Sequence, residues 1–126
     1  MSNPTLIKSY VAEAAVLPYR VVKFGTADGQ VVQAAAAADA SVGIADALGQ
    51  GTAGSRVDVA VDGIAEAEAG AAVARGALVS VDSSGRVITA TASAGANVRV
   101  IGVAMSAAGA AGEIILVSIK PGSFQG

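Results

Sequence analysis

The chain contains no cysteine, histidine or tryptophan, and its 126 residues include only two tyrosines and two phenylalanines. Without cysteine it forms no disulfide and has no thiol nucleophile. Without histidine it lacks the commonest general base and the usual zinc ligands, so we expect neither a metal site nor a bound cofactor. A small domain without such staples is expected to gain stability by oligomerisation or by binding to a larger surface.

Charge is also scarce. The eight lysine and arginine residues are scattered singly and the formal net charge is -2, so no basic stripe is available for nucleic acid. The apolar segment from Val100 to Ile119 contains Glu113 and several glycines, which favours two strands around a turn over a membrane span. The N-terminus has no long apolar region, so we expect no signal peptide and a soluble intracellular protein.

Hydrophobic alternation predicts strands rather than helices. Valines alternate with acidic residues or alanine from Val57 to Asp62, and the segment from Ile64 to Glu68 repeats this period. The segment from Ile114 to Ile119 is apolar at nearly every position, which predicts a central strand covered on both sides. Residues 27–30 and 82–86 each contain a glycine suited to a hairpin turn. These features predict an all-β fold, either a small β-barrel or a sandwich.

The two halves of the chain resemble each other. The segment VVKFGTADGQVVQA at Val21 matches LVSVDSSGRVITA at Leu78 as strand, turn and strand, VGIADA matches IGVAMS, and VDVAV matches ILVSI. The first residues of these pairs lie 57, 59 and 58 positions apart. We interpret the matches as a degenerate duplication that gives a pseudo-twofold fold with halves at about 19–63 and 76–122. The alternative is a chance alignment within a chain rich in valine, alanine and glycine.

Carboxylate pairs are the strongest candidates for chemistry. Glu66 and Glu68 share one side of a predicted strand, and Asp58 and Asp62 share another. Acid–base catalysis needs unequal, desolvated environments, and a calcium site needs more oxygen ligands than two acids supply. Exposed sheet faces explain both pairs more simply, so we predict that the protein is not an enzyme. An enzyme that uses Glu66 and Glu68 stays open as an alternative.

The large contact-forming side chains are concentrated at the two ends of the chain. Residues 1–18 include Pro4 and show no helical pattern, so we expect an extended N-terminal arm, followed by a single β domain at 19–126. Aromatic residues dominate interface energetics because each carries a large area on few rotatable bonds. We interpret Phe24 as an ordinary core residue. We therefore predict that Leu6, Ile7, Tyr10, Tyr19 and Phe124 lie at an interface with a partner or with another subunit.

The order of several sequence pieces supports a family resemblance. SYVAEAAVLPYRVVKFGTADGQVVQA is followed by GSRVDVAVDGIAEAEAGAAVARGALVSVDSSGRVITA, then by RVIGVAM and the closing PGSFQG. In this order the pieces resemble the small capsid decoration, or head cement, proteins of tailed bacteriophages. The resemblance covers nearly the whole chain, although each piece alone carries little information.

The resemblance implies a structural protein of the virion, made in the host cytoplasm and bound to the capsid exterior. It implies an oligomer, with a trimer favoured and a dimer possible, that clamps neighbouring subunits of the major capsid protein. Nucleic acid and membrane are not expected partners. The alternative function is a carbohydrate- or ligand-binding β module on the virion surface, although the middle of the chain has no aromatic platform for a sugar.

Overall fold

The protein is an all-β molecule, as the alternation predicts. The computed structural model describes residues 3–37, 39–46, 48–91 and 97–125, and these residues form strands, turns and loops without a helix. Across them, therefore, no helix is long and apolar enough to traverse a lipid bilayer. The strands are β1 (Asn3–Ala12), β2 (Val21–Phe24), β3 (Gln30–Gln33), β4 (Ser41–Ala45), β5 (Arg56–Glu68), β6 (Leu78–Val81), β7 (Val87–Thr89), β8 (Asn97–Ala104) and β9 (Ile114–Gln125).

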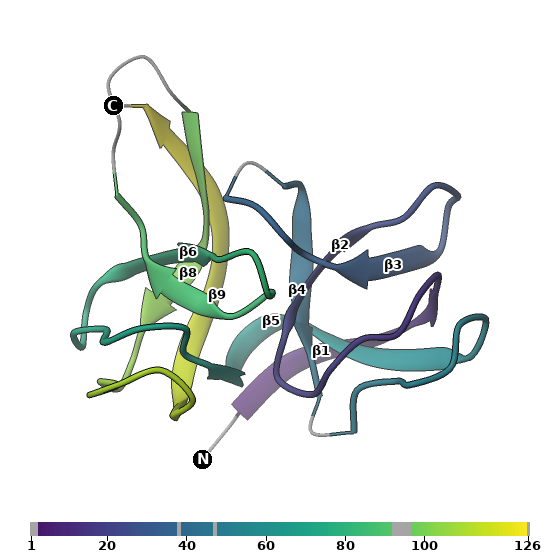
Figure 1. The fold of residues 1–126 in the computed structure, drawn as a ribbon, viewed down its shortest axis with the longest axis horizontal. Helices are drawn as coiled ribbons and strands as arrows, with labels where there is room; N and C mark the ends of the chain where they lie inside the picture. Colours follow the sequence, from purple (N-terminus) through teal and green to yellow (C-terminus); the bar gives the residue numbers. More distant parts are fainter. Residues whose placement is uncertain (1–2, 38, 47, 92–96, 126) are drawn as a thin grey trace.

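The first half of the chain is a closed barrel. Strands β1, β3, β2, β4 and β5 are hydrogen-bonded in this order, and β1 also pairs with β5, which closes the ring (Figure 1). β1 runs antiparallel to β5 from Asn3 opposite Ile64 to Val11 opposite Arg56. Its contact with β3 is shorter, because the parallel pairing involves only Val11 and Ala12 on β1.

The second half is built on the same long strand. β5 continues beyond the barrel, and its residues Gly63–Glu68 pair antiparallel with β9. β8, β6 and β7 follow in order across the sheet. One parallel bridge between Ala69 and Val87 brings β7 back beside the end of β5. Strand β5 therefore serves as the last strand of the first half and the first strand of the second.

Matching hydrogen bonds confirm the internal duplication. Val16 and Gln50 exchange backbone bonds of 2.7 and 2.8 Å, and Val73 and Ala108 exchange two bonds of 2.9 Å. The Gly54 amide donates to the Ala12 carbonyl at 2.7 Å, and the Gly112 amide donates to the Ala69 carbonyl at 2.8 Å. Equivalent residues in these pairs lie 57 or 58 positions apart. The weak sequence matches therefore reflect two copies of one backbone arrangement.

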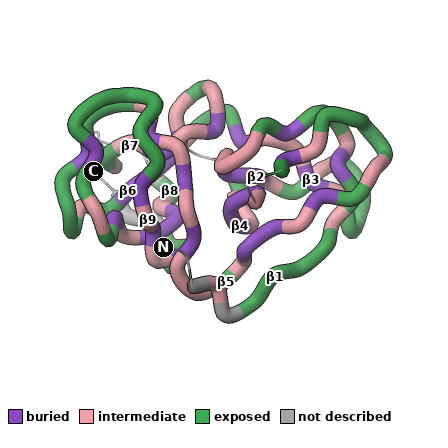
Figure 2. Tube along the Cα trace, turned by 90° about the horizontal axis from the view of Figure 1, so that it is seen from below, coloured by how far each residue is buried: buried purple, intermediate pink, exposed green. Residues whose placement is uncertain are grey.

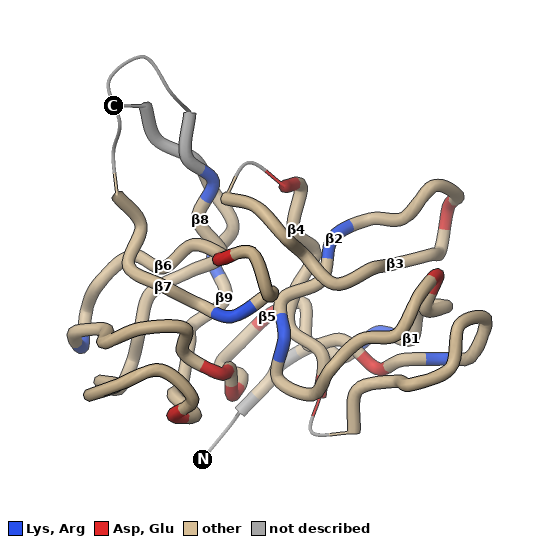
Figure 3. The backbone as a smooth tube through the Cα atoms, in the orientation of Figure 1, with Lys and Arg blue, Asp and Glu red and all other residues tan. Residues whose placement is uncertain are grey.

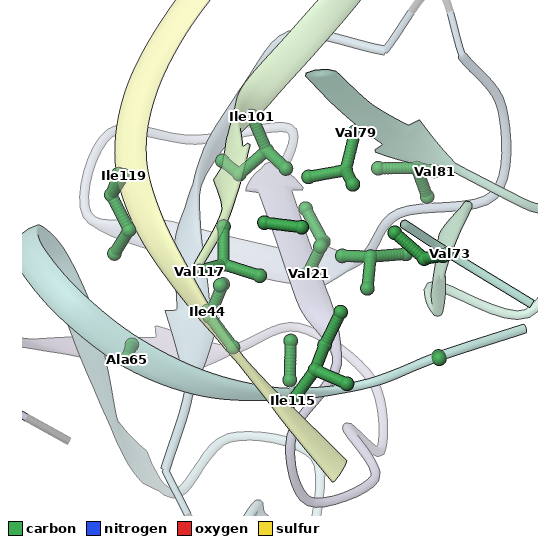
Figure 4. Packing of buried hydrophobic residues seen from close by; sticks show 14 of the residues in the cluster. Val21, Ile44, Ala65, Val73, Val79, Val81, Ile101, Ile115, Val117 and Ile119 are labelled. Atoms are coloured by element: carbon green, nitrogen blue, oxygen red, sulfur yellow. The ribbon is translucent and has the colours of Figure 1, made fainter. Parts of the chain in front are cut away.

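Buried side chains form two clusters, one for each half. In Figure 2 the buried residues follow the strands, and most exposed residues lie in the loops. The first cluster fills the barrel and includes Ala12, Val16, Val22, Val31, Ala45, Val57 and Val59. The second lies in the second half but also contains Val21 and Ile44 from the first half. Figure 4 shows these two side chains among Val79, Ile101 and Val117, so the outer face of the barrel forms part of the second core.

A polar network borders the contact between the halves. The Arg20 guanidinium donates to the Ser84 carbonyl at 2.8 Å and lies 3.2 Å from the Glu68 carboxylate. Arg86 reaches the same carboxylate at 3.7 Å, and the Gln33 amide also donates to the Ser84 carbonyl. Glu68 was expected on an exposed sheet face; instead, its side chain is only 21% exposed because it pairs with two arginines. Its role here is structural.

Phe24 was expected in the core, and this interpretation is wrong. The side chain is 56% exposed. Phe24 is the last residue of β2, and the turn of the β2–β3 hairpin begins directly after it. The ring therefore lies at the rim of the barrel, beyond the level at which Val22 and Val31 fill the interior.

The predicted arm is extended but is not separate from the β domain. Its residues Asn3–Ala12 form β1, and their backbone pairs along β5 of the same chain. Buried or closely packed backbone groups need hydrogen-bond partners, and β5 supplies them. The segment expected as an arm is therefore a wall of the barrel, and the interface residues that it carries are presented on a paired strand.

Candidate interaction surface

Strand β1 presents two large apolar side chains to solvent. Leu6 is 53% exposed and Ile7 is 54% exposed, although both lie on a strand that is paired along β5. Among the described strands, the opposite edge of β1 pairs with β3 only at Val11 and Ala12. The stretch Asn3–Tyr10 therefore combines an edge that can accept a further strand with exposed apolar side chains, two features that mark interaction sites.

A pocket adjoins this strand. It has a volume of about 250 Å³, and its lining includes Pro4 and Ile7 of β1 together with Tyr19. The buried residues Ile44 and Ala60 also line it. The carboxylate-bearing residues among its lining are Asp46 and Glu66. The fold therefore brings Ile7 and Tyr19, which are 12 positions apart in the chain, to one concave site.

Tyr19 is held in an unusual backbone conformation. Its φ is 62°, and it is the only residue other than glycine with a positive φ that is recorded among the described residues. Its amide donates to the Asp46 carbonyl at 3.3 Å, and its carbonyl accepts from the Glu68 amide at 3.1 Å. The equivalent residue of the second half is Gly76, with a φ of 89°. A tyrosine at a position that suits glycine indicates that the ring itself has a use.

The other two predicted interface residues lie elsewhere. Tyr10 is partly buried and packs against the core cluster of the barrel, and the Lys8 ammonium lies 5.4 Å from the centre of its ring. Its ring therefore helps to fill the molecule's own interior. Phe124 belongs to β9, where its backbone pairs with Val98, but its side chain lies outside the part of the structure that is described.

A second apolar surface, which was not predicted, lies on the outer face of the second half. Ile114 was expected on a strand covered on both sides, but only one side of β9 is covered, by the packing of Ile115, Val117 and Ile119 into the core. Ile114 on the other side is 42% exposed. Leu78 and Met105 lie on neighbouring segments and are 47% and 46% exposed. The nearly continuous apolar run from Ile114 to Ile119 was the sequence signal for an apolar residue on this face.

Charges are spread thinly over the molecule. Figure 3 shows acidic and basic residues scattered along the described backbone. Hydrogen bonds from the side chain and the backbone of Thr26 lower the pKa of Glu13. Burial raises the pKa of Asp39, but hydrogen bonds from the Ala35 and Ala36 amides and the nearby Lys23 outweigh it, so that the pKa is lowered. Both carboxylates hold backbone segments in place, Glu13 through the Thr26 amide and Asp39 through the Ala35 and Ala36 amides.

The described residues contain no group of three or more histidine, cysteine, aspartate or glutamate side chains that would hold a metal ion. A second pocket, lined by Asp46, Gln50, Arg56 and Asp58 among others, is mostly polar. Asp58 there accepts a hydrogen bond from the Ser9 hydroxyl at 2.8 Å and lies 4.0 Å from Arg56.

These observations describe a duplicated β protein whose distinctive surfaces are exposed apolar strand residues. Comparison with known families gives the same class: residues 5–119 match the model of the phage cement proteins. The chain therefore belongs to the phage cement protein family, and it is a structural protein associated with the phage capsid. This result confirms the resemblance that the sequence pieces suggested.

Comparison with solved structures supports the fold. The head fiber gp8.5 N base of bacteriophage phi29 matches with a TM-score of 0.62 and 18% sequence identity, over 91% of this chain and 93% of that chain. At this level of identity, the match shows that the two proteins share a fold. No curated protein sequence matched the chain.

Proposed function

We propose that the protein binds the outside of the phage capsid as an oligomer and stabilises it by clamping neighbouring subunits of the major capsid protein. Family membership over residues 5–119 supports the capsid as the target. The observation that carries the proposal is the surface of β1, where Leu6 and Ile7 are exposed beside a strand edge and beside the pocket that Tyr19 lines. The protein acts by adhesion, not by catalysis.

Binding follows from two contacts of different kinds. A strand or loop of the capsid protein pairs with the edge of β1 along Asn3–Tyr10, so that backbone hydrogen bonds supply part of the affinity. An apolar side chain of the capsid protein enters the pocket between Ile7 and Tyr19, and this contact supplies specificity. Strand pairing fixes the direction of the contact, and the pocket fixes its register.

Each contact needs only modest strength. Leu6 and Ile7 are about half exposed, so covering both contributes about 1 kcal/mol each. A protein that touches two capsid subunits, or that carries several copies of the site in one oligomer, gains further affinity through effective concentration. This added affinity makes the separation of neighbouring capsid subunits less favourable, and in this way the protein stabilises the shell.

Point substitutions on β1 test the proposal, because deletion of β1 would open the barrel itself. We expect the double variant Leu6→Asp, Ile7→Asp to fold but to lose cosedimentation with capsids that lack this protein, since two carboxylates would lie in an apolar contact. Leu48→Asp is the matched control, because Leu48 is 83% exposed in a loop outside β1. Equal binding by the double variant and the wild-type protein would contradict the role of β1.

A carbohydrate-binding module on the virion surface is the second candidate. The pocket combines the ring of Tyr19 with Asp46 and Glu66, and an aromatic face beside carboxylates is an arrangement suited to a sugar. Saturable binding on a glycan array that is lost in Tyr19→Ala would favour this function over capsid clamping.

A further inference from the structure

The contact between the two halves has two distinct faces. The first half supplies an outer face, with Val21 and Ile44 at its centre, and both side chains are at most 1% exposed. The second half supplies a receiving face, where Val81, Ile101 and Ile119 are at most 4% exposed. Because the faces differ, the halves are joined head to tail, and such a contact can repeat.

The duplication places a second copy of each face on the other half. The outer face recurs on the second half, where Leu78 and Val103 are equivalent to Val21 and Ile44. Leu78 is 47% exposed, whereas Val21 is fully buried. In the single chain, no neighbouring half covers this copy of the outer face within the described residues.

The receiving face recurs on the first half with the same loss of cover. Phe24 is equivalent to Val81, and its exposed fraction is 56% where that of Val81 is 4%. Val42 and Val61 are equivalent to Ile101 and Ile119 and are half-buried, although their counterparts are fully buried. The contact between the halves thus covers one outer face and one receiving face. The second copy of each face is left uncovered, one on each half.

The ion pair at the edge of the contact between the halves has apolar equivalents on the two uncovered faces. Arg20 and Glu68 form an ion pair at 3.2 Å between the halves. Their equivalents, by the same offset of 57 positions, are Ala77 and Val11. Val11 is 40% exposed. Both charged partners are thus replaced by apolar residues, so the two uncovered faces remain compatible with each other and leave no charge unpaired.

We propose that a second copy of the chain docks head to tail, with its Phe24 face on the Leu78 face of the first copy. The contact between the halves is the template for this docking. In one respect docking differs from the template. Within the chain, the Val21 amide of the first half donates to the Gly85 carbonyl of the second half. The matching carbonyl on the first half is that of Gly29, and it already accepts a hydrogen bond from the Val11 amide at 2.9 Å. The docked copy therefore packs on the barrel rim, and the contact between β1 and β3 stays closed.

Two single substitutions separate the faces. Leu78→Asp damages only the outer face and Phe24→Asp only the receiving face, and both side chains are exposed enough that each variant folds. The wild-type protein should associate in size-exclusion chromatography with light scattering, without capsids. Self-association of each variant alone should be at least about tenfold weaker than that of the wild-type protein, so that each variant elutes as a monomer. Leu48→Asp is the control and should associate like the wild-type protein.

Mixing the two variants is the decisive step. Each retains one intact face, so an equimolar mixture should form a 1:1 heterodimer and nothing larger. A wild-type monomer at its highest soluble concentration would overturn the proposal, as would a mixture that stays monomeric or a Phe24→Asp variant that still associates. Because this measurement uses no capsid, failure here leaves capsid binding through β1 intact, and failure of cosedimentation leaves this proposal intact.

Discussion

At the scale of single residues, Tyr19 illustrates how the duplication diverged. The backbone turns at this position with a positive φ in both halves, and the second half uses Gly76. The left-handed conformation costs a residue with a Cβ roughly 1 kcal/mol relative to glycine. The first half accepts this cost at Tyr19, a residue that lines the pocket together with Ile7. The strained position and the proposed binding site therefore coincide.

Substitutions at Tyr19 separate the effect of backbone strain on stability from the effect of losing the aromatic ring. Tyr19→Gly and Tyr19→Ala both remove the ring, but only glycine relieves the left-handed backbone, so Tyr19→Gly should be more stable than Tyr19→Ala by roughly 1 kcal/mol. Urea denaturation gives the comparison. The control compares the wild-type protein with Ala74→Gly. Because φ at Ala74 is not positive, glycine there should lower the stability. A Tyr19→Gly variant no more stable than Tyr19→Ala would refute the strain.

At the scale of elements, close approach of neighbouring strands explains a repeated glycine. Gly43 on β4 and Gly102 on β8 occupy equivalent places in the repeated VGIA and IGVA segments. A Cβ on Gly43 would collide with the backbone oxygen of Ala60, and one on Gly102 with that of Ser118. Both collisions are with backbone of the paired strand, which cannot move without disturbing the sheet. The repeat therefore conserves a backbone distance as well as a pattern.

The glycine of β8 gives a direct test of this packing. Gly102→Ala should lower the free energy of unfolding by about 2 kcal/mol or more, because the added methyl group overpacks the contact between β8 and β9. Gly51→Ala is the matched control, since a Cβ there meets no atom within 4 Å. Chemical denaturation measures both. Similar stabilities for the two variants would mean that the strands are not so close.

The strands were the most predictable elements. Alternation along β5 and the turns that contain Gly29 and Gly85 are local signals, and the structure places a strand and two hairpins there. The pairing of β1 with β5 was not predictable, because no local pattern specifies a partner about 50 residues away. Exposure of Phe24 was also missed, since burial at the barrel rim depends on whether a neighbouring half is present.

At the scale of the whole molecule, the chain consists of two similar halves with different tasks. The first half closes on itself through β1, and Tyr10 packs against its core. In the second half, β7 returns to the end of β5 through the bridge between Ala69 and Val87, and the outer face of the first half, with Val21 and Ile44, completes the core. The first half thus supports the second and also carries the surface of Leu6, Ile7 and Tyr19. The aromatic residues near the N-terminus divide between these two tasks.

The contact role of the candidate residues stays a prediction. Leu6 and Ile7 are exposed, and Ile7 shares a pocket with Tyr19. Tyr10 was also expected to contact a partner, but its partly buried side chain packs against the core cluster of its own barrel. The surface around Leu78 escaped notice, since its significance becomes visible only when it is compared with the equivalent face of the first half.

An electron cryo-microscopy map of the decorated capsid tests the central claim most directly. Our account predicts that β1 faces the shell, with Leu6 and Ile7 in contact with the major capsid protein and a capsid side chain in the pocket beside Tyr19. A map in which β1 faces solvent, while another surface of the protein contacts the shell, would contradict it.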